Sequence, residues 1–279
     1  MSKLSAALKA LLHAPSSHPG TTPAPKNIAQ LFRKIGEHAE KNQVERPAWL
    51  AMASAATFTM NSPDSLAILH HEASKDKGLK ESIKHAELIR EVGLKCIGLN
   101  GIPRTIVCLD GLHSQLPDEV KNSLTTTPSR TVTPANVEDT KARGRQLWDS
   151  IYRPHHTKLI DKLAMYHPDL PVWIVDSAYG MLFADPDRQP VKGQQVGRVL
   201  TSIVAIACLR AQTGVAPQLM SHVFGLKKAM NDETWKNDVQ NEIGAKWLAS
   251  DSGITWILES VDQITHAIGE SKTNRQSRI

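Results

Sequence analysis

Three residues near the middle of the chain have side chains that could take part in catalysis: Glu91, Cys96 and Arg104. A carboxylate can move protons, a thiol can act as a nucleophile, and a guanidinium can hold an anionic group. At about 3.6 residues per turn, Glu91 and Cys96 point about 140° apart on one helix and do not share a face. Glu91 does share a face with Lys95, which predicts a surface ion pair. The alternative is a Glu–Cys site in which Arg104 lowers the pKa of the thiol.

His222 is the strongest single candidate for acid–base chemistry, because an imidazole gains and loses its proton near neutral pH. A structural histidine, hydrogen-bonded within packed helices, is the alternative. Arg104 follows Pro103 at a predicted helix start, where the helix dipole also favours anions. Arg104 is therefore the candidate to hold an anionic group of a substrate, and an exposed or interface arginine is the alternative.

Several histidines could suggest a metal site: His70, His71, His113, His155 and His156. Adjacent histidines on a helix point about 100° apart and rarely bind one ion. The chain contains no His-Glu-x-x-His sequence and no closely spaced pair of cysteines. The sequence therefore predicts neither a metal ion nor a cofactor.

The elements that would position these residues are predicted to be helices. Proline or a capping residue marks several helix starts, at 46–47, 62–63 and 103, and Asn100-Gly101 is a typical helix end. A long helix is expected from about Ser82 to Leu99. In the second part of the chain, apolar residues at helical spacing predict helices at about 136–152, 156–166, 170–183, 194–210, 216–230, 233–248 and 253–268.

The polar stretch 125–135, TTTPSRTVTPA, divides the chain, because its threonines and prolines are typical of an exposed connector. We expect helical halves at 27–124 and 136–270, with flexible ends at 1–26 and 271–279. The apolar run Val199–Leu209 is rich in Val and Ile, but its length favours a buried helix over a strand. The predicted fold class is all-α.

Composition limits the classes of function. The net charge is +5, but the basic residues are scattered and aromatic residues make up only 5%, which argues against nucleic-acid binding. No segment is long and apolar enough to predict a membrane span. Three cysteines are too few for a disulfide framework, which favours a reducing compartment.

The two ends of the chain carry conflicting targeting signals. Residues 1–36 contain no Asp or Glu, and Met1–His13 could form an amphipathic helix followed by a flexible linker, as in an organelle-import presequence. A flexible terminus with a chance excess of positive charge is the alternative. The C-terminal Ser277-Arg278-Ile279 is a loose variant of the Ser-Lys-Leu peroxisomal signal. We expect a mitochondrial protein, with a peroxisomal or cytoplasmic location as the alternatives.

Two stretches resemble the AhpD-like and carboxymuconolactone decarboxylase-like superfamily. Residues 87–106 read ELIREVGLKCIGLNGIPRTI, which resembles the family's helix, glycine-proline turn and second helix. Residues 197–225 end in QLMSHVFG, which is similar to the start of the helix that follows the family's central helix pair. The resemblance implies an all-α AhpD-like fold with two related helical halves, a small-molecule substrate and a homo-oligomer.

The chain departs from the family at the redox site. The hydroperoxidase members carry a glutamate, a Cys-x-x-Cys pair and a histidine, and only the histidine is matched, by His222. Val215 and Gln218 occupy the cysteine positions. A thiol–disulfide cycle needs two sulfurs within bonding distance, and no close pair exists in the sequence, so the family's dithiol route is not expected.

Two functions therefore stay open. The first is an enzyme that transfers protons on a small carboxylate or hydroperoxide-like substrate, with His222, Glu91 and Cys96 as catalytic residues and Arg104 as the anion holder. The second is a non-catalytic member that has lost the redox site and acts through oligomerisation or partner binding. A cavity where these side chains converge would favour the enzyme.

Overall fold

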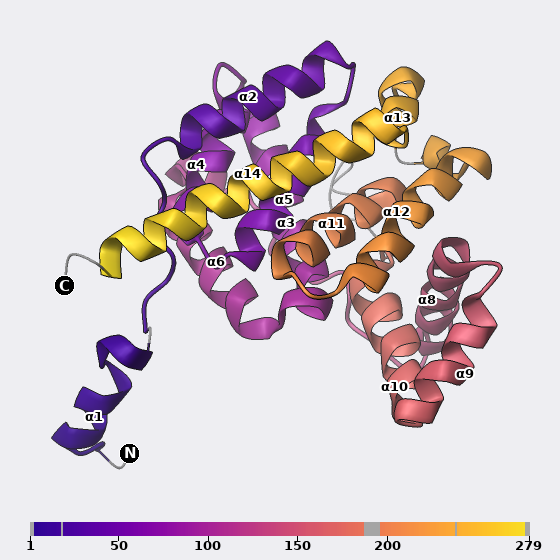
Figure 1. The fold of residues 1–279 in the computed structure, drawn as a ribbon, viewed down its shortest axis with the longest axis horizontal. Helices are drawn as coiled ribbons and strands as arrows, with labels where there is room; N and C mark the ends of the chain where they lie inside the picture. Colours follow the sequence, from indigo (N-terminus) through magenta and orange to yellow (C-terminus); the bar gives the residue numbers. More distant parts are fainter. Residues whose placement is uncertain (1–2, 18, 187–195, 238, 277–279) are drawn as a thin grey trace.

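The computed structural model describes residues 3–17, 19–186, 196–237 and 239–276, and these ranges form helices and no strand (Figure 1). The all-α prediction is confirmed. The first part of the chain forms α1 (Ala6–Leu12), the 3-10 turn η1 (Pro15–Ser17), α2 (Ile28–Lys41), α3 (Arg46–Thr59), α4 (Pro63–Ser74), α5 (Leu79–Asn100), α6 (Ile102–Gln115) and α7 (Asp118–Lys121). The second part forms α8 (Val137–Tyr152), α9 (His156–Tyr166), α10 (Asp169–Val172), the π-helix η2 (Trp173–Phe183), α11 (Gly197–Gln212), α12 (Ala216–Asn231), the 3-10 turn η3 (Thr234–Asn237), α13 (Glu242–Leu248) and α14 (Asp251–Gln276).

The predicted signals at the end of α5 are confirmed. Gly101 has a φ of +86°, a conformation that glycine adopts without steric cost, and it separates α5 from α6. Pro103 then lies in the first turn of α6. The helix predicted at 233–248 is instead interrupted, because Asn241 caps a new helix with its side-chain oxygen, which accepts hydrogen bonds from the backbone of Ile243 and Gly244.

Two fully buried helices form the centre of the molecule. Every residue from Ala48 to Thr59 in α3 and from Val199 to Leu209 in α11 is buried. These two helices pack against each other, and α5 and α14 pack against both. A helix that is apolar all round must be enclosed by other elements, which explains why the run Val199–Leu209 is a helix rather than a strand. The larger core therefore combines elements from both predicted halves.

A second, smaller core lies in the lobe formed by α8, α9, α10 and η2. It contains Trp148 and Ile151 from α8 together with Val175, Tyr179 and Phe183 from η2. The two elements approach closely because glycines face each other: a Cβ atom on Gly144 would lie 2.5 Å from the backbone nitrogen of Gly180. This lobe extends from one side of the main bundle (Figure 1).

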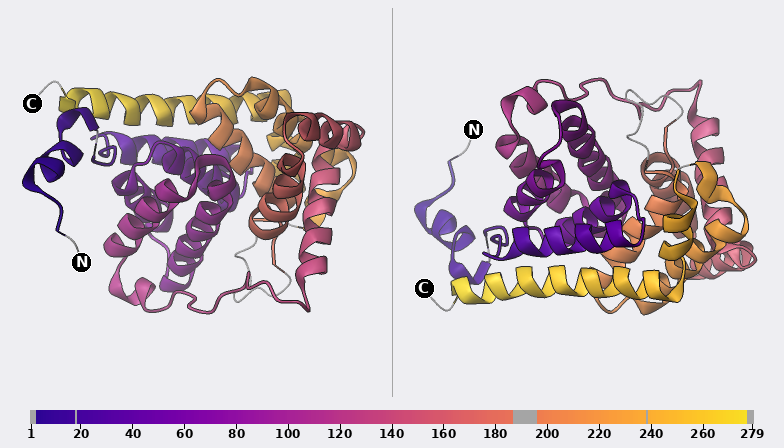
Figure 2. Two further views of the ribbon diagram at one scale, coloured as in Figure 1. Left: turned by 90° about the horizontal axis from the view of Figure 1, so that it is seen from below. Right: turned by 90° about the horizontal axis from the view of Figure 1, so that it is seen from above.

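The longest helix, α14, lies along α2 and covers one face of the bundle, whereas α1 lies outside it (Figure 2). The chain joins the body again at Thr22, whose N–H donates to the carbonyl of Asn61 (3.0 Å) and whose Oγ1 donates to that of Met60 (2.8 Å). Among the described residues, no helix has the length and apolar character needed to cross a bilayer.

Candidate functional site

Two cysteines meet where α5 crosses α11. The Sγ atoms of Cys96 and Cys208 lie 3.5 Å apart, and both side chains are fully buried. Cys96 was a candidate from the sequence, but Cys208 was not, since 112 positions separate the two. The sulfurs are reduced at this distance, and a bond between them requires each to move by less than about 1 Å.

The two thiols have different surroundings. Burial raises the pKa of the Cys208 thiol, but hydrogen bonds from Cys96, Thr59 and Asn100 outweigh burial and bring this pKa below its ordinary value. The amide nitrogen of Asn100 lies 3.6 Å from the Cys208 sulfur. Burial, together with the hydrogen bond to Cys208, raises the pKa of Cys96 well above its ordinary value. Cys208 is therefore the thiol of the pair that ionises more readily.

A cavity of about 480 Å³ lies next to this pair, and its wall includes Thr59 and Asn100. The Nε2 atom of Gln212 donates to the side-chain oxygen of Asn100 (2.9 Å) and holds this amide in place. Arg104 also lines the cavity, and its Nη1 donates to the backbone carbonyl of Thr59 (2.8 Å). One layer of polar side chains thus separates the Cys208 sulfur from a cavity that carries a positive charge.

The predicted influence of Arg104 on Cys96 is not found. Arg104 instead lowers the pKa of Cys108, although burial is the stronger effect and raises that pKa to about 12. Cys108 is also fully buried. It lies apart from the pair on α6, where its thiol donates a weak hydrogen bond to the Asn61 side chain (3.9 Å).

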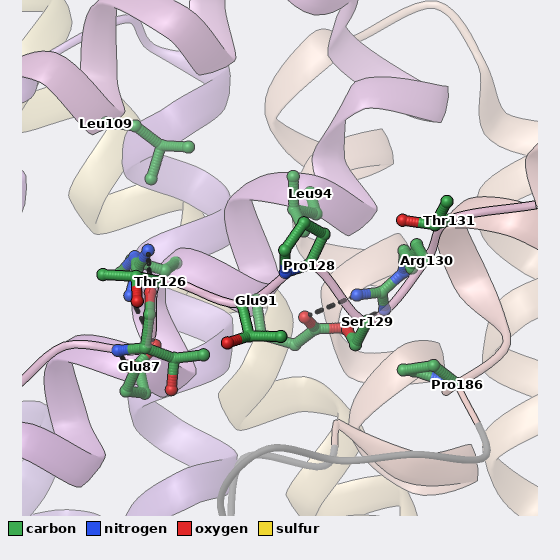
Figure 3. Close-up of a pocket in the computed structure, with 13 residues that line it drawn as sticks. Glu87, Glu91, Leu94, Leu109, Thr126, Pro128, Ser129, Arg130, Thr131 and Pro186 are labelled. Carbon is green, nitrogen blue, oxygen red and sulfur yellow. Dashed lines mark hydrogen bonds and ion pairs between the residues drawn. The ribbon is translucent and has the colours of Figure 1, made fainter.

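Glu91 faces a different cavity, of about 510 Å³, between α5 and the stretch Thr125–Thr131 (Figure 3). Its carboxylate forms a two-pronged ion pair with Arg130, whose Nη1 lies 3.0 Å from Oε2. The predicted pair with Lys95 is wrong. Lys95 is fully buried and pairs with Asp185 (3.0 Å). Glu91 faces the connector and Cys96 faces α11, which agrees with their spacing on the helix.

The charged side chains that line the cavity beside Glu91 are already paired with one another. Glu87 pairs with Arg90 (2.8 Å) and accepts the N–H of Thr125, and Arg90 donates to the carbonyl of the same threonine (3.1 Å). Together with the Glu91–Arg130 pair, these contacts fasten the polar connector to α5. We assign them a structural role, because each carboxylate already has its cation.

His222 is buried in the junction between α12 and α8. Its Nε2 lies 3.4 Å from the hydroxyl of Tyr152, which accepts a hydrogen bond from the hydroxyl of Tyr179 (2.9 Å). Its Nδ1 is buried and has no hydrogen-bond partner among the described residues. Burial, with a smaller contribution from the positive charge of Arg198, lowers the pKa of His222 to about 4.

The imidazole and the thiol pair are separate sites. Arg198, which lies near His222, precedes Cys208 on α11 by ten residues, or about 15 Å along the helix axis. His222 lines neither of the two cavities. The candidate residues His222, Glu91 and Arg104 therefore do not converge. Among the residues that the structure describes, no three His, Cys, Asp or Glu side chains are grouped as a metal site would need.

Comparison with known proteins shows a similarity to a curated yeast protein. The chain is 30% identical over 187 residues to Peroxisomal protein 2 of Saccharomyces cerevisiae, and the match covers 60% of this chain and 62% of the relative. The chain thus matches less than two thirds of the relative's length. No protein-family model and no solved structure matches the chain. The mitochondrial location expected from the N-terminal segment is contradicted, because the relative is named for the peroxisome.

Proposed function

We propose that this chain is a peroxisomal dithiol enzyme, a divergent AhpD-like protein that reduces a small hydroperoxide with Cys208 and Cys96. The observation that carries the proposal is the 3.5 Å separation of the two sulfurs beside a cavity. The peroxisomal part rests on the similarity to Peroxisomal protein 2. Ser277-Arg278-Ile279, the loose variant of the peroxisomal signal, lies outside the described residues.

The chemistry follows from the difference between the thiols. The Cys208 thiolate attacks the outer oxygen of the hydroperoxide, the O–O bond breaks, and the alkoxide leaves with a proton as an alcohol. Cys208 is then a sulfenic acid, and the Cys96 thiol attacks its sulfur, forming a disulfide and releasing water. An external dithiol reduces the disulfide and is itself oxidised, which returns both cysteines to the starting state.

The cavity supplies the groups that this reaction needs. The Asn100 amide and the Thr59 hydroxyl lie between the sulfur and the cavity, and their hydrogen bonds favour the thiolate. Arg104 gives the cavity a positive charge that attracts an anionic substrate group such as a carboxylate. Both cysteines are enclosed, so a substrate would reach Cys208 only after the Asn100 side chain moves aside and its contact with Gln212 breaks.

A second candidate is proton transfer by His222 on a small carboxylate or hydroperoxide-like substrate. It is favoured by the hydrogen-bonded series Tyr179, Tyr152 and His222 and by the buried, unpartnered Nδ1 atom. An imidazole with a pKa near 4 is neutral at physiological pH and can accept a proton, although it is a weak base. The dithiol proposal has the stronger support, since only the side chains of Thr59 and Asn100 separate the Cys208 thiol from a cavity, whereas His222 lines neither of the two cavities described above.

The test is hydroperoxide turnover by the full chain with dithiothreitol as the reductant. We expect Cys208→Ser to abolish turnover. Without dithiothreitol, Cys96→Ser is expected to consume one equivalent of hydroperoxide and to stop at the sulfenic acid, which a dimedone adduct reports by mass. Cys108→Ser, at an equally buried thiol outside the pair, is the matched control and keeps full turnover. If instead His222→Ala abolishes turnover and both cysteine variants retain it, the proton-transfer candidate replaces the dithiol one.

Absence of turnover in every variant and in the native chain would support the non-catalytic alternative. We also propose a homo-oligomer, as the family resemblance implies. Met220 and Phe224 lie one turn apart on α12 and are more than half exposed, which offers an apolar contact. Light scattering on the native chain and on Phe224→Asp tests this: the native chain is expected to be a multimer and the variant a monomer.

A further inference from the structure

Helix α1 has an apolar face that nothing in the described chain covers. Leu8, Leu11 and Leu12 lie on one face of α1, and Leu4 lies just before the helix; these leucines are 43%, 68%, 52% and 50% exposed, respectively. All residues of α1 are exposed. The helix lies outside the bundle, joined to it by the segment that ends at Thr22 (Figures 1 and 2).

The helix needs a surface to be stable. A helix of seven residues is too short to persist alone in water, and its helical state must be stabilised by packing of its apolar face. Ser5 supplies a cap, since its hydroxyl accepts a hydrogen bond from the backbone of Leu8 (3.2 Å). This cap is worth only about 1 kcal/mol, so most of the stabilisation comes from elsewhere.

The charge of residues 1–36 indicates what kind of surface would stabilise α1. Residues 1–36 contain no acidic residue, Lys9 lies on α1, and Lys3 lies just before it. An exposed leucine face in a segment with lysines and without acidic residues is typical of helices that lie in the headgroup region of a bilayer. Anionic lipids satisfy both features at once, because the acyl chains take up the leucines and the headgroups attract the lysines.

We infer that α1 docks on an anionic lipid surface and holds the protein there reversibly. Four leucines and two lysines give weak binding, of the strength that attaches a peripheral protein without fixing it. Thr22 ties the segment to the bundle, and it also lines the cavity near Cys208. The inference does not depend on the thiol chemistry.

The experiment is sedimentation of the purified full chain with vesicles of phosphatidylcholine, alone or mixed with phosphatidylserine. We expect binding to the anionic vesicles and much weaker binding to the neutral ones. Replacing Leu8 and Leu11 together by Ser is expected to weaken binding by about tenfold or more. Replacing Lys3 and Lys9 by Gln is expected to weaken binding to the anionic vesicles by about fivefold per lysine.

Leu79→Ser is the matched control, because Leu79 is 43% exposed, as Leu8 is, but lies on the helical body. It is expected to bind like the native chain. Native affinity in the Leu8/Leu11 variant, equal binding to both kinds of vesicle, or no binding by the native chain would each overturn the inference. All variants are expected to share the melting temperature of the native chain, since α1 adds nothing to the core.

Discussion

The sulfur atoms of Cys96 and Cys208 lie 3.5 Å apart, although one residue belongs to the first half of the chain and the other to the second. The contact exists because α5 and α11 cross in the centre of the bundle. Asn100 lies one turn beyond Cys96 on α5 and reaches both the Cys208 sulfur and the adjoining cavity. The proposed thiol chemistry thus depends on a crossing of helices rather than on a local sequence motif.

Arg104→Gln is expected to raise the KM for a short hydroperoxide that carries a carboxylate by about tenfold while kcat stays the same, because Arg104 would bind the substrate without touching the reacting oxygens. Cumene hydroperoxide, which is uncharged, is the control, and its KM is expected to be unaltered. Steady-state kinetics with both substrates measures the effect. An equal loss of kcat for both would show that Arg104 instead supports the structure through its hydrogen bond to Thr59.

Acid is expected to destabilise the protein through its buried histidines. Burial holds the pKa of His222 at about 4, and the pKa of His85 lies at about 4 as well, whereas an unfolded histidine titrates near 6.5. The unfolded chain therefore binds more protons between these values. The contribution of the two neutral histidines to the free energy of unfolding is therefore fully present above about pH 6.5. It is lost as the pH decreases towards 4.

Urea denaturation of His222→Gln at several pH values measures this contribution. Between pH 6.5 and 4, the native chain is expected to lose roughly 2 to 3 kcal/mol more than the variant. His113→Gln, at an exposed histidine, is the control and follows the native chain. Parallel curves for the native chain and His222→Gln would show that the pKa of His222 is the same in the folded and unfolded states.

Lys95→Met is expected to lower the free energy of unfolding by about 3 kcal/mol. The ammonium group is fully buried, where it donates to the carbonyl of Phe183 and pairs with Asp185, and its removal leaves that carboxylate without its cation. Lys84→Met, which breaks the exposed pair with Glu81, is the control and is expected to cost about 0.5 kcal/mol or less. Equal midpoints of chemical denaturation for the two variants would contradict this ranking.

The sequence predicted much of the secondary structure because the signals are local. The glycine stop after Asn100 and the proline start at Pro103 act on the nearest turn of backbone, and both are found where they were expected. The interruption of the helix predicted at 233–248 was missed, because Asn241 competes as a cap within a stretch whose apolar spacing is still helical. The ion pair of Glu91 was also missed, because its partner Arg130 lies on the connector.

The sequence by itself determined the helical class, most helix ends and the burial of Val199–Leu209, since these follow from residue spacing and backbone preference over a few turns. Only the tertiary structure decided which chemical groups meet. It joined Cys208 to Cys96, left His222 enclosed with two tyrosines, and placed Arg104 at the cavity. Such contacts depend on how distant helices cross, and neither the position of a residue in the chain nor its type specifies that crossing.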